Sequence, residues 1–209
     1  MGSLKPAKDG LLIIITLAAL TALFMFLSLY LLSMAMFIFW GFVVWFFRDP
    51  DRVFPEGENI LASPADGRIV EIESVTHPFT GDSLKIGIFM SPFCVHVNRV
   101  PCAGTVEYLE YVPGKKIAAY APKASEVNER NYVGLRTQYG PILLVQIAGF
   151  VARRIVCRVK RGDIFSAGER YGMIKLGSKV DIYLPANLKL KVKIGDKVYA
   201  GKSVLGVMG

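Results

Sequence analysis

Histidine and cysteine are both scarce in this chain of 209 residues, and their scarcity narrows the chemistry that it can support. The three cysteines, Cys94, Cys102 and Cys157, are odd in number and show no C-x-x-C spacing, so the sequence indicates neither a disulfide framework nor a zinc site. We expect reduced thiols in a domain that faces the cytoplasm. With two histidines and no ligand spacing among the carboxylates, we expect no metal site.

Sequence motifs for nucleotide and nucleic-acid binding are also missing. The chain contains no G-x-G-x-x-G or G-x-x-x-x-G-K-[ST] phosphate loop, and no G-x-S-x-G nucleophile elbow. The formal net charge is +8, from 25 basic and 17 acidic residues, but no run of Lys or Arg exceeds two residues. Nucleic acid is therefore not an expected partner.

Charge is absent from one long stretch, residues 10–47, which holds no Asp, Glu, Lys, Arg or His. As a single helix it would run about 57 Å, against a bilayer hydrocarbon core of roughly 30 Å. Two short spans, or a re-entrant hairpin that turns near residues 28–34, fit this length better than one tilted helix. A cleaved signal peptide fits poorly because its apolar region is only about 7 to 15 residues long. We expect residues 1–47 to form an α-helical transmembrane hairpin that anchors a soluble domain, residues 48–209.

Basic residues flank the apolar stretch on both sides, with Lys5 and Lys8 before it and Arg48 and Arg52 after it. Because positively charged flanks stay on the cytoplasmic side of a membrane, we expect an even number of crossings. The sequence thus predicts a protein of the cell membrane whose soluble domain lies on the cytoplasmic side.

The soluble domain has the sequence pattern of a mainly β fold. Short apolar runs alternate with Gly, Pro, Asp and Asn, and no helical apolar stripe continues beyond two turns. A single helical turn is predicted at residues 124–129. The predicted strands are residues 67–73, 84–90, 94–100, 104–112, 132–137, 142–147, 155–159 and 179–184.

A short internal repeat appears in the last third of the chain. Residues 159–168 match residues 192–201 at a shift of 33, and each copy contains Gly-Asp followed by Ala-Gly. The glycines suit tight turns with positive φ. The pattern resembles the hairpins of biotinyl and lipoyl domains, so we expect a β-sandwich with barrel-sandwich hairpin elements. No lysine stands at a hairpin tip as in a lipoyl domain, so this resemblance concerns architecture alone.

The two histidines stand in different settings. His77 precedes Pro78 in a turn-rich stretch, which is typical of a surface loop. His96 lies in a predicted strand, where the two-residue period places Cys94, His96 and Asn98 on one face. Such a residue is either a hydrogen-bonded core histidine or a general acid or base.

Six groups of motifs, in this order along nearly the whole chain, resemble the phosphatidylserine decarboxylase family. The match is closest to the short form of the family, which includes archaetidylserine decarboxylases. The motifs are residues 47–50 (FRDP), 63–67 (SPADG), 90–92 (MSP) with 96–99 (HVNR), 123–125 (KAS) with 128–131 (NERN), 146–149 (QIAG) with 152–154 (ARR), and 172–174 (GMI) with 177–178 (GS).

The resemblance implies that the chain is a proenzyme that cuts itself between Gly177 and Ser178. Ser178 would become a covalent pyruvoyl group at the start of an α chain, residues 178–209, with residues 1–177 as the β chain. The pyruvoyl carbonyl would take the substrate amine as a Schiff base and act as the electron sink for decarboxylation, without a metal. The expected reaction turns phosphatidylserine, a membrane phospholipid, into phosphatidylethanolamine and CO2.

The resemblance also assigns roles to two further residues. His96 would activate the Ser178 hydroxyl and later protonate the carbanion. Asp66 would orient the His96 imidazole, as the aspartate does in a serine triad. Without the resemblance, Asp66 would be read as part of an Asp-Gly turn.

Several alternatives stay open from the sequence. Cys94 and Arg99 depart from residues that are common in relatives, which leaves the division of labour around His96 open. Lys179, after Ser178, also departs from the usual residue, which leaves the rate of the cut open. Archaetidylserine is an alternative substrate because the lipid tails lie away from the chemistry, and a non-enzymatic, membrane-anchored lipoyl-like adaptor is a rival of another class. The sequence does not fix a homo-oligomer or the substrate-binding residues, for which the candidates are Arg99, Arg153 and Arg154.

Overall fold

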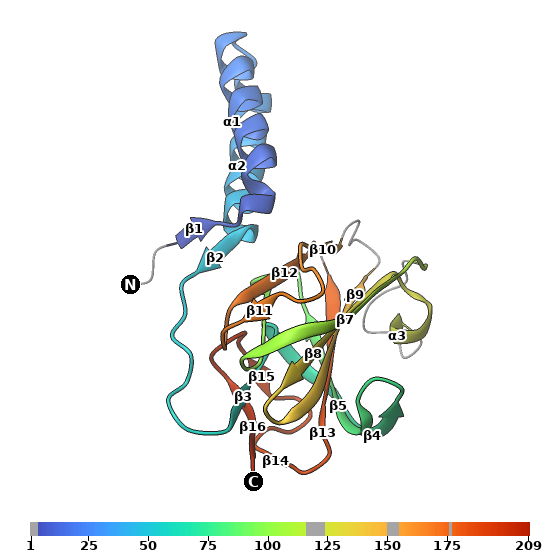
Figure 1. Ribbon diagram of the computed structural model, residues 1–209. Helices are drawn as coiled ribbons and strands as arrows, with labels where there is room; N and C mark the ends of the chain where they lie inside the picture. The colour runs from blue at the N-terminus through green and yellow to red at the C-terminus, as the bar shows by residue number, and fades with distance from the viewer. Residues whose placement is uncertain (1–3, 116–123, 150–154, 176) are drawn as a thin grey trace. The chain divides into compact units, whose positions relative to one another are not determined.

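A computed structural model of the chain describes residues 4–115, 124–149, 155–175 and 177–209 (Figure 1). The chain divides into two compact units, Met1–Asp51 and Arg52–Gly209. The first unit is helical apart from one short strand pair, and the second is built from β-strands. The prediction of a mainly β chain is therefore confirmed, and the two units are described separately.

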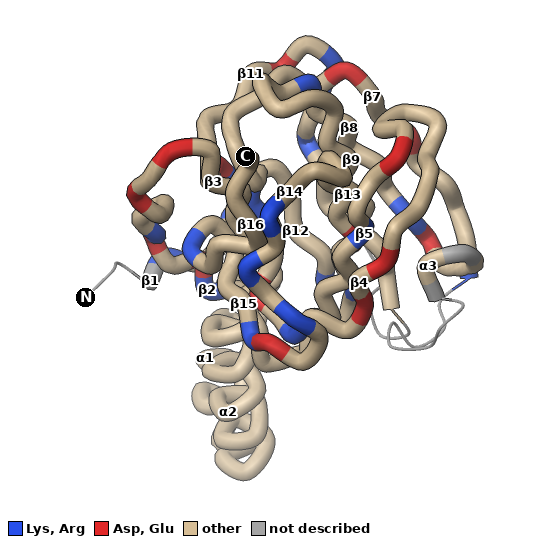
Figure 2. The backbone as a smooth tube through the Cα atoms, turned by 90° about the horizontal axis from the view of Figure 1, so that it is seen from below, with Lys and Arg blue, Asp and Glu red and all other residues tan. Residues whose placement is uncertain are grey.

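Two apolar helices pack side by side in the first unit. Helix α1 is Leu11–Phe26 and helix α2 is Tyr30–Phe46, and Ser28 in the turn between them has φ 58°. A short 3-10 helix, η1 (Lys8–Gly10), precedes α1, and β1 (Leu4–Pro6) pairs with β2 (Arg48–Pro50). Neither α1 nor α2 contains a charged residue (Figure 2).

Hydrogen bonds from polar side chains join the two helices. The Trp40 indole donates to the Ile14 carbonyl at 3.1 Å, and the Ser33 hydroxyl donates to the Thr21 carbonyl at 3.1 Å. At the open end, Gly10 leaves room for Phe47, because a Cβ on this glycine would lie 2.2 Å from the Phe47 ring. Ser33 and Trp40 thus find hydrogen-bond partners within the apolar pair, as a nonpolar surrounding favours.

One of the described helices has the length and composition to cross a membrane. The segment Lys8–Phe26 has 19 residues and a mean hydropathy of 2.2, whereas Tyr30–Phe46 is apolar but shorter. Most of their large apolar side chains, such as Leu12, Phe26 and Leu31, are exposed. These features support membrane association, although a signal sequence passes the same test of length and composition.

Within the described residues of the second unit, eight strands form one antiparallel sheet in the order β11-β7-β8-β9-β13-β5-β4-β15 (Figure 1). Strand β13 lies inside the sheet, between β9 and β5. The strands are β4 (Gly67–His77), β5 (Gly81–Met90), β7 (Gly104–Val112), β8 (Arg130–Thr137), β9 (Gly140–Ala148), β11 (Ile164–Phe165), β13 (Ser178–Pro185) and β15 (Lys197–Val198).

Two smaller sheets complete the described part of this unit. One has the order β10-β12-β6 and the other β14-β16-β3. The main core holds Ile86, Leu144 and Val180 from the large sheet and Leu61 and Leu205 from one small sheet. The strands are β3 (Ile60–Ala62), β6 (Val97–Arg99), β10 (Ile155–Cys157), β12 (Arg170–Ile174), β14 (Leu188–Leu190) and β16 (Val204–Met208), and α3 (Ala124–Val127) is a single helical turn.

The internal repeat is visible in the backbone. Gly162 and Gly195 have φ of 89° and 95°, and their amides donate to the carbonyls of Val106 and Ile69, each at 2.8 Å. In return, the amides of Val106 and Ile69 donate to the residues after these glycines, each at 2.9 Å. The two turns therefore dock in the same way on two different strands, β7 and β4.

The second glycine of each repeat copy also has a positive φ and an amide that donates to a distant carbonyl. Gly168 and Gly201 have φ of 76° and 66°, and their amides donate to the carbonyls of Val100 and Ser63. The predicted positive φ at these turns is confirmed. The contacts relate residues 63–69 to residues 100–106, so the repeat belongs to an internal pseudo-symmetry of the unit.

The segment around His96 differs from its prediction. The strand predicted over residues 94–100 is shorter, because the Cys94 amide closes a turn on the Ser91 carbonyl at 2.9 Å and β6 begins only at Val97. Burial does not distinguish the two faces of this segment. Val95, His96, Val97 and Asn98 are all buried, because both faces of this short segment are covered.

Tyr171, on β12, has a buried hydroxyl without a hydrogen-bond partner among the described residues. Burial raises the pKa of this phenol well above its usual range. A buried polar atom without a partner costs about 1 to 3 kcal/mol. We therefore expect Tyr171→Phe to leave the free energy of unfolding unchanged or to raise it by about 1 kcal/mol, as measured by urea unfolding. A clear loss of stability would contradict this expectation.

Candidate active site

Ser178 is the first residue of β13, at the point where the chain enters the interior of the large sheet. Its register partners are Met90 on β5 and Ala148 on β9, and its side chain is fully buried. The Ser178 hydroxyl lies 3.5 Å from the Met90 sulfur. Gly177, directly before it, has φ 60°, which a residue with a side chain rarely adopts. The predicted scissile bond thus joins a left-handed glycine to a buried serine.

His96 lies next to the strand that leads to this bond. Its carbonyl accepts a hydrogen bond from the amide of Ile174, the last residue of β12, at 3.3 Å. The imidazole is fully buried, and its Nδ1 lies 2.9 Å from the Cys94 carbonyl. A carbonyl at this distance selects the tautomer that carries the proton on Nδ1, which leaves Nε2 as the basic nitrogen.

A ladder of buried amides connects the histidine segment to Ser178. Asn131 donates to Gln146 at 3.1 Å, and Gln146 donates to Asn98 at 2.9 Å. The Asn98 amide lies 3.8 Å from the same Met90 sulfur that Ser178 contacts. Because buried amides need partners, this ladder fixes β6 against β9 beside the serine.

Asp66 does not make the predicted contact with His96. Its carboxylate instead forms a two-pronged pair with Arg52, with distances of 2.5 and 2.8 Å, and accepts the Ala200 amide at 2.8 Å. The planar guanidinium matches a carboxylate in two parallel bonds, which explains why Arg52 occupies this group. The turn of Asp66 still lies near the histidine segment, because the Arg99 amide donates to the Pro64 carbonyl at 2.9 Å.

A cluster of buried and partly buried charges lies on the opposite face of the sheet from Ser178. The Lys179 ammonium hydrogen-bonds to the Glu71 carboxylate and to the Ser125 hydroxyl at 2.9 Å, and it lies 3.0 Å from the Asp181 carboxylate. Lys85 contacts Glu71 at 2.9 Å. The side chains of Lys179 and Asp181 are only 7% and 2% exposed. We call Glu71, Lys85, Lys179 and Asp181 the charge cluster.

Burial and ion pairing act in opposite directions on the acids of the charge cluster. Burial raises the pKa of Asp181, although Lys179 and Lys85 work against this effect. At Glu71, burial also acts to raise the pKa, but hydrogen bonds from Lys179 and Lys85 outweigh it and lower the pKa from 4.5 to about 2. Glu71 therefore stays ionised where an ordinary glutamate would be protonated.

The lowered pKa of Glu71 predicts a pH dependence of stability. Because the pKa is lower in the folded than in the unfolded chain, the ionised group stabilises the fold above pH 4.5, and this contribution is lost as the pH falls toward 2. Water screens the partly exposed carboxylate, so we expect a contribution of about 1 kcal/mol. Urea unfolding should show a smaller loss between pH 4.5 and 2 in Glu71→Gln than in the parent chain. An equal loss of the free energy of unfolding in both chains over this pH range would contradict the lowered pKa of Glu71.

Arg99 and His77, which the sequence also singles out, make contacts elsewhere in the second unit. The Arg99 guanidinium is buried and donates to the Gly168 carbonyl at 3.0 Å, so it supports a turn of the repeat. Arg153 and Arg154 lie outside the described residues. His77 ends β4, where its Nδ1 accepts the Phe79 amide at 3.1 Å, and burial lowers its pKa.

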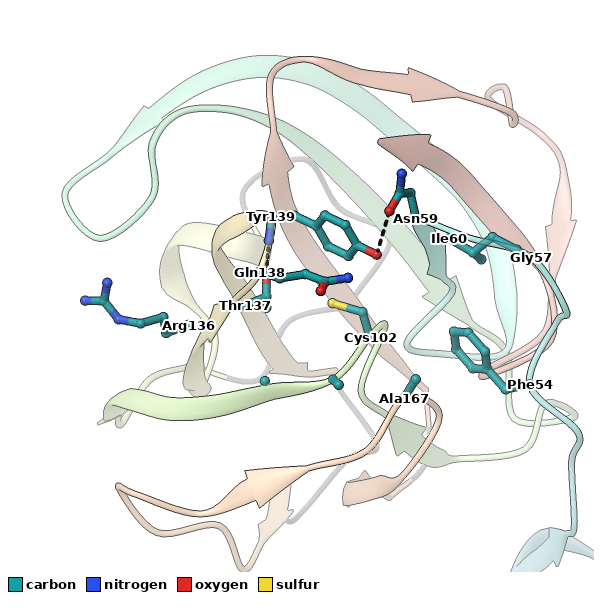
Figure 3. A pocket seen from close by; sticks show the side chains of 12 residues that line it. Phe54, Gly57, Asn59, Ile60, Cys102, Arg136, Thr137, Gln138, Tyr139 and Ala167 are labelled. Atoms are coloured by element: carbon teal, nitrogen blue, oxygen red, sulfur yellow. Dashed lines mark hydrogen bonds between the residues drawn. The ribbon is translucent and has the colours of Figure 1, made fainter. Parts of the chain in front are cut away.

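A cavity of about 400 Å³ lies on another part of the unit (Figure 3). Its lining includes Cys102, Ala103, Tyr139 and Ala167, and the Tyr139 hydroxyl donates to Asn59 at 3.3 Å. By the pseudo-symmetry, Ala103 and Ala167 correspond to Asp66 and Ala200, and the Ala200 carbonyl also accepts a hydrogen bond from Arg52, at 2.7 Å. Burial raises the pKa of Cys102 to about 12, so this thiol stays protonated and is a poor nucleophile. Cys102 is therefore not a candidate nucleophile.

No group of three metal-ligating side chains occurs within the described ranges. Comparison with known proteins then decides the family, because a model described as phosphatidylserine decarboxylase matches residues 39–206. The chain belongs to the phosphatidylserine decarboxylase family. It is therefore related to carboxy-lyases.

Relatives named phosphatidylserine decarboxylase proenzyme match over most of their length. The protein of Carboxydothermus hydrogenoformans is 44% identical over 95% of this chain and 94% of its own. That of Nitratidesulfovibrio vulgaris is 45% identical over 91% and 88%. That of Ralstonia pickettii is 50% identical over 78% and 77%.

The sequence does not predict several of the contacts that surround the candidate site. Arg52 was considered only as a flanking charge, and nothing in its spacing reveals that it pairs with Asp66. Glu71 and Lys85 were not considered as site residues, although alternation along their paired strands places them on one face. Asn98 and Gln146 were part of the motifs, but their contact depends on how two sheets meet.

Proposed function

We propose that this chain is a self-cleaving proenzyme that converts phosphatidylserine to phosphatidylethanolamine and CO2. The observation that carries the proposal is the junction of Gly177, in the left-handed region, with Ser178, fully buried at the start of a central strand. The similarity to proenzymes of this name over most of the chain supports the same conclusion.

The Gly177–Ser178 bond is the proposed site of cleavage. Ser178 Oγ attacks the Gly177 carbonyl carbon, the C–N bond breaks, and an ester forms while the nitrogen of residue 178 takes up a proton. Loss of the Ser178 Cα proton then expels Gly177 as a carboxylate and leaves dehydroalanine. Water replaces the nitrogen, which departs as ammonia, and residue 178 ends as a pyruvoyl group. A glycine before the serine suits this chemistry because it adopts the positive φ without strain and leaves room for the incoming oxygen.

His96 is the proposed general base for this attack. A serine hydroxyl is a weak nucleophile unless a base accepts its proton. With its Nδ1 held by the Cys94 carbonyl, the His96 ring keeps Nε2 for proton transfer. Asp66 is proposed to hold its own turn in place. Its carboxylate does so through the pair with Arg52 and the hydrogen bond that it accepts from the Ala200 amide.

The surroundings of residue 178 suit a pyruvoyl group. The carbonyl would lie in a buried position beside the Met90 sulfur, on the face that the amide ladder supports. When formed, the pyruvoyl group supplies an electron sink for the electrons released on loss of CO2. The chain's residues exclude water, hold the group in register and provide the acid that protonates the product, for which His96 is the candidate.

The lipid substrate fits a protein with an apolar helical unit. We propose that Met1–Asp51 holds the enzyme at the cell membrane, with the decarboxylase unit on the cytoplasmic side, where substrate is supplied in two dimensions. The α and β chains of one proenzyme stay together, since β13 pairs on both sides with strands of the β chain. Archaetidylserine is the alternative substrate, because its headgroup presents the same chemistry.

A denaturing gel and a lipid assay test the proposed function together. The purified full chain should show two fragments, residues 1–177 and 178–209. It should release CO2 from vesicles that contain phosphatidylserine. The rate of CO2 release from vesicles that contain archaetidylserine then shows which of the two lipids is the better substrate. An uncut chain that releases no CO2 from either lipid would contradict the proposal and favour a non-enzymatic adaptor.

A further inference from the structure

The charge cluster begins at the residue that follows the proposed cut. Lys179 is held by Glu71 on β4, by Asp181 on its own strand and by Ser125 in α3. Its side chain is 7% exposed, so these partners replace nearly all of its hydration. Lys179 therefore ties the start of β13, one residue after the reactive position, to two other segments, β4 and α3.

The alternation of β13 shows what this anchoring can control. Ser178, Val180 and Ile182 face the main core or the amide ladder, whereas Lys179 and Asp181 point to the other face. In a strand, a slip of one residue turns every side chain to the opposite face. Such a slip would place the Lys179 ammonium in the apolar core and remove residue 178 from Met90.

Stability alone gives little reason for this arrangement. Burying charges carries a large desolvation penalty, and well-packed apolar residues often replace a buried ion cluster at no loss of stability. Buried paired charges instead select a single strand register, because a strand that slips by one residue leaves these charges without partners. This property matters most after cleavage, when residue 178 becomes a chain terminus, since termini fray unless they are held.

We propose that Lys179 is a positioning residue that keeps residue 178 in register, first as the attacking serine and then as the pyruvoyl terminus. The inference rests on the proposed function of the Gly177–Ser178 bond. Lys179 does not touch the reacting atoms, because it lies on the other face of the sheet. It acts through β13, whose first residues it fastens to β4 and α3.

The test compares Lys179→Met with Lys85→Met in the full-length protein. Both changes remove one buried ammonium that contacts Glu71, but Lys85 pairs in register with Tyr183, farther along β13 from the cut. The Lys85 ammonium approaches Asp181 only to 4.0 Å, against 3.0 Å for Lys179. In fully processed enzyme, we expect Lys179→Met to lower kcat about tenfold or more, with KM unchanged, because small misplacements of a reacting group are costly. Lys85→Met should change kcat much less at a similar loss of melting temperature.

A milder variant keeps the proposal testable if Lys179→Met does not fold. Ser125→Ala removes only the 2.9 Å contact to the Lys179 ammonium and should lower kcat by a few-fold in the same direction, about what one hydrogen bond provides. Amide hydrogen exchange at residues 179–181 should be faster in both variants than in Lys85→Met.

The outcomes distinguish a failure of the proposed self-cleavage from a failure of the inference about Lys179. An uncut parent chain would contradict the proposed function itself. If the parent is cut and Lys179→Met is not, while Lys85→Met is, Lys179 positions the serine in the first step. If Lys179→Met and Ser125→Ala match Lys85→Met in cleavage, kcat and hydrogen exchange, the charge cluster is merely structural and the inference is wrong.

Discussion

Ser178→Ala should leave the protein as one uncut chain of 209 residues and abolish decarboxylation. Without Oγ, no ester can form at Gly177 and no pyruvoyl group can arise from residue 178. The loss of activity should exceed about a thousandfold, as for removal of a nucleophile. The fold should survive, because alanine removes one oxygen from a buried position whose contact is the Met90 sulfur.

A matched control uses another buried serine on a strand that pairs with β13. Ser83 is 3% exposed and pairs with Pro185, at the opposite end of the strand. Ser83→Ala should lose its hydrogen bond to the Thr80 hydroxyl and some stability, but it should still be cut. Cleavage in Ser178→Ala, seen on a denaturing gel, would contradict the assignment of the scissile bond.

His96→Ala should slow self-cleavage by about 10² to 10⁴-fold, the usual contribution of a general base. The measurement is a time course of the two fragments after synthesis of the chain in a cell-free system. His77→Ala is the control, because His77 lies among aromatic side chains at the end of β4 and should leave cleavage unchanged. If His96→Ala is cut at the parent rate, another group takes the proton from Ser178.

Much of the β unit could be predicted because local patterns determine it. The prediction for residues 104–112 matches β7 at both ends, and the strand predicted at residues 179–184 lies within β13. Both have short apolar runs bounded by turn residues. Strand β12 was missed, because its Tyr-Gly-Met segment carries no clear alternation and pairs with β6 and β10 from distant parts of the chain.

The site was less predictable than the fold, because its side-chain contacts join residues that are far apart in the sequence. Ser178 stood out through the motifs, and its burial beside Met90 agrees with a protected reactive group. Asp66 was expected beside His96, but Arg52 takes its carboxylate with a geometry that no spacing reveals. Likewise, Lys179 appeared as a departure from relatives, whereas its meaning depends on Glu71 and Ser125.

In the proposed function, residue 178 changes chemically when the backbone breaks before it. Intact-mass analysis of the small fragment from freshly purified protein tests this claim most directly. We predict residues 178–209 with a mass one ammonia lower than that of a fragment that begins with serine. A fragment with an unmodified serine terminus, or a single intact chain, would contradict the account.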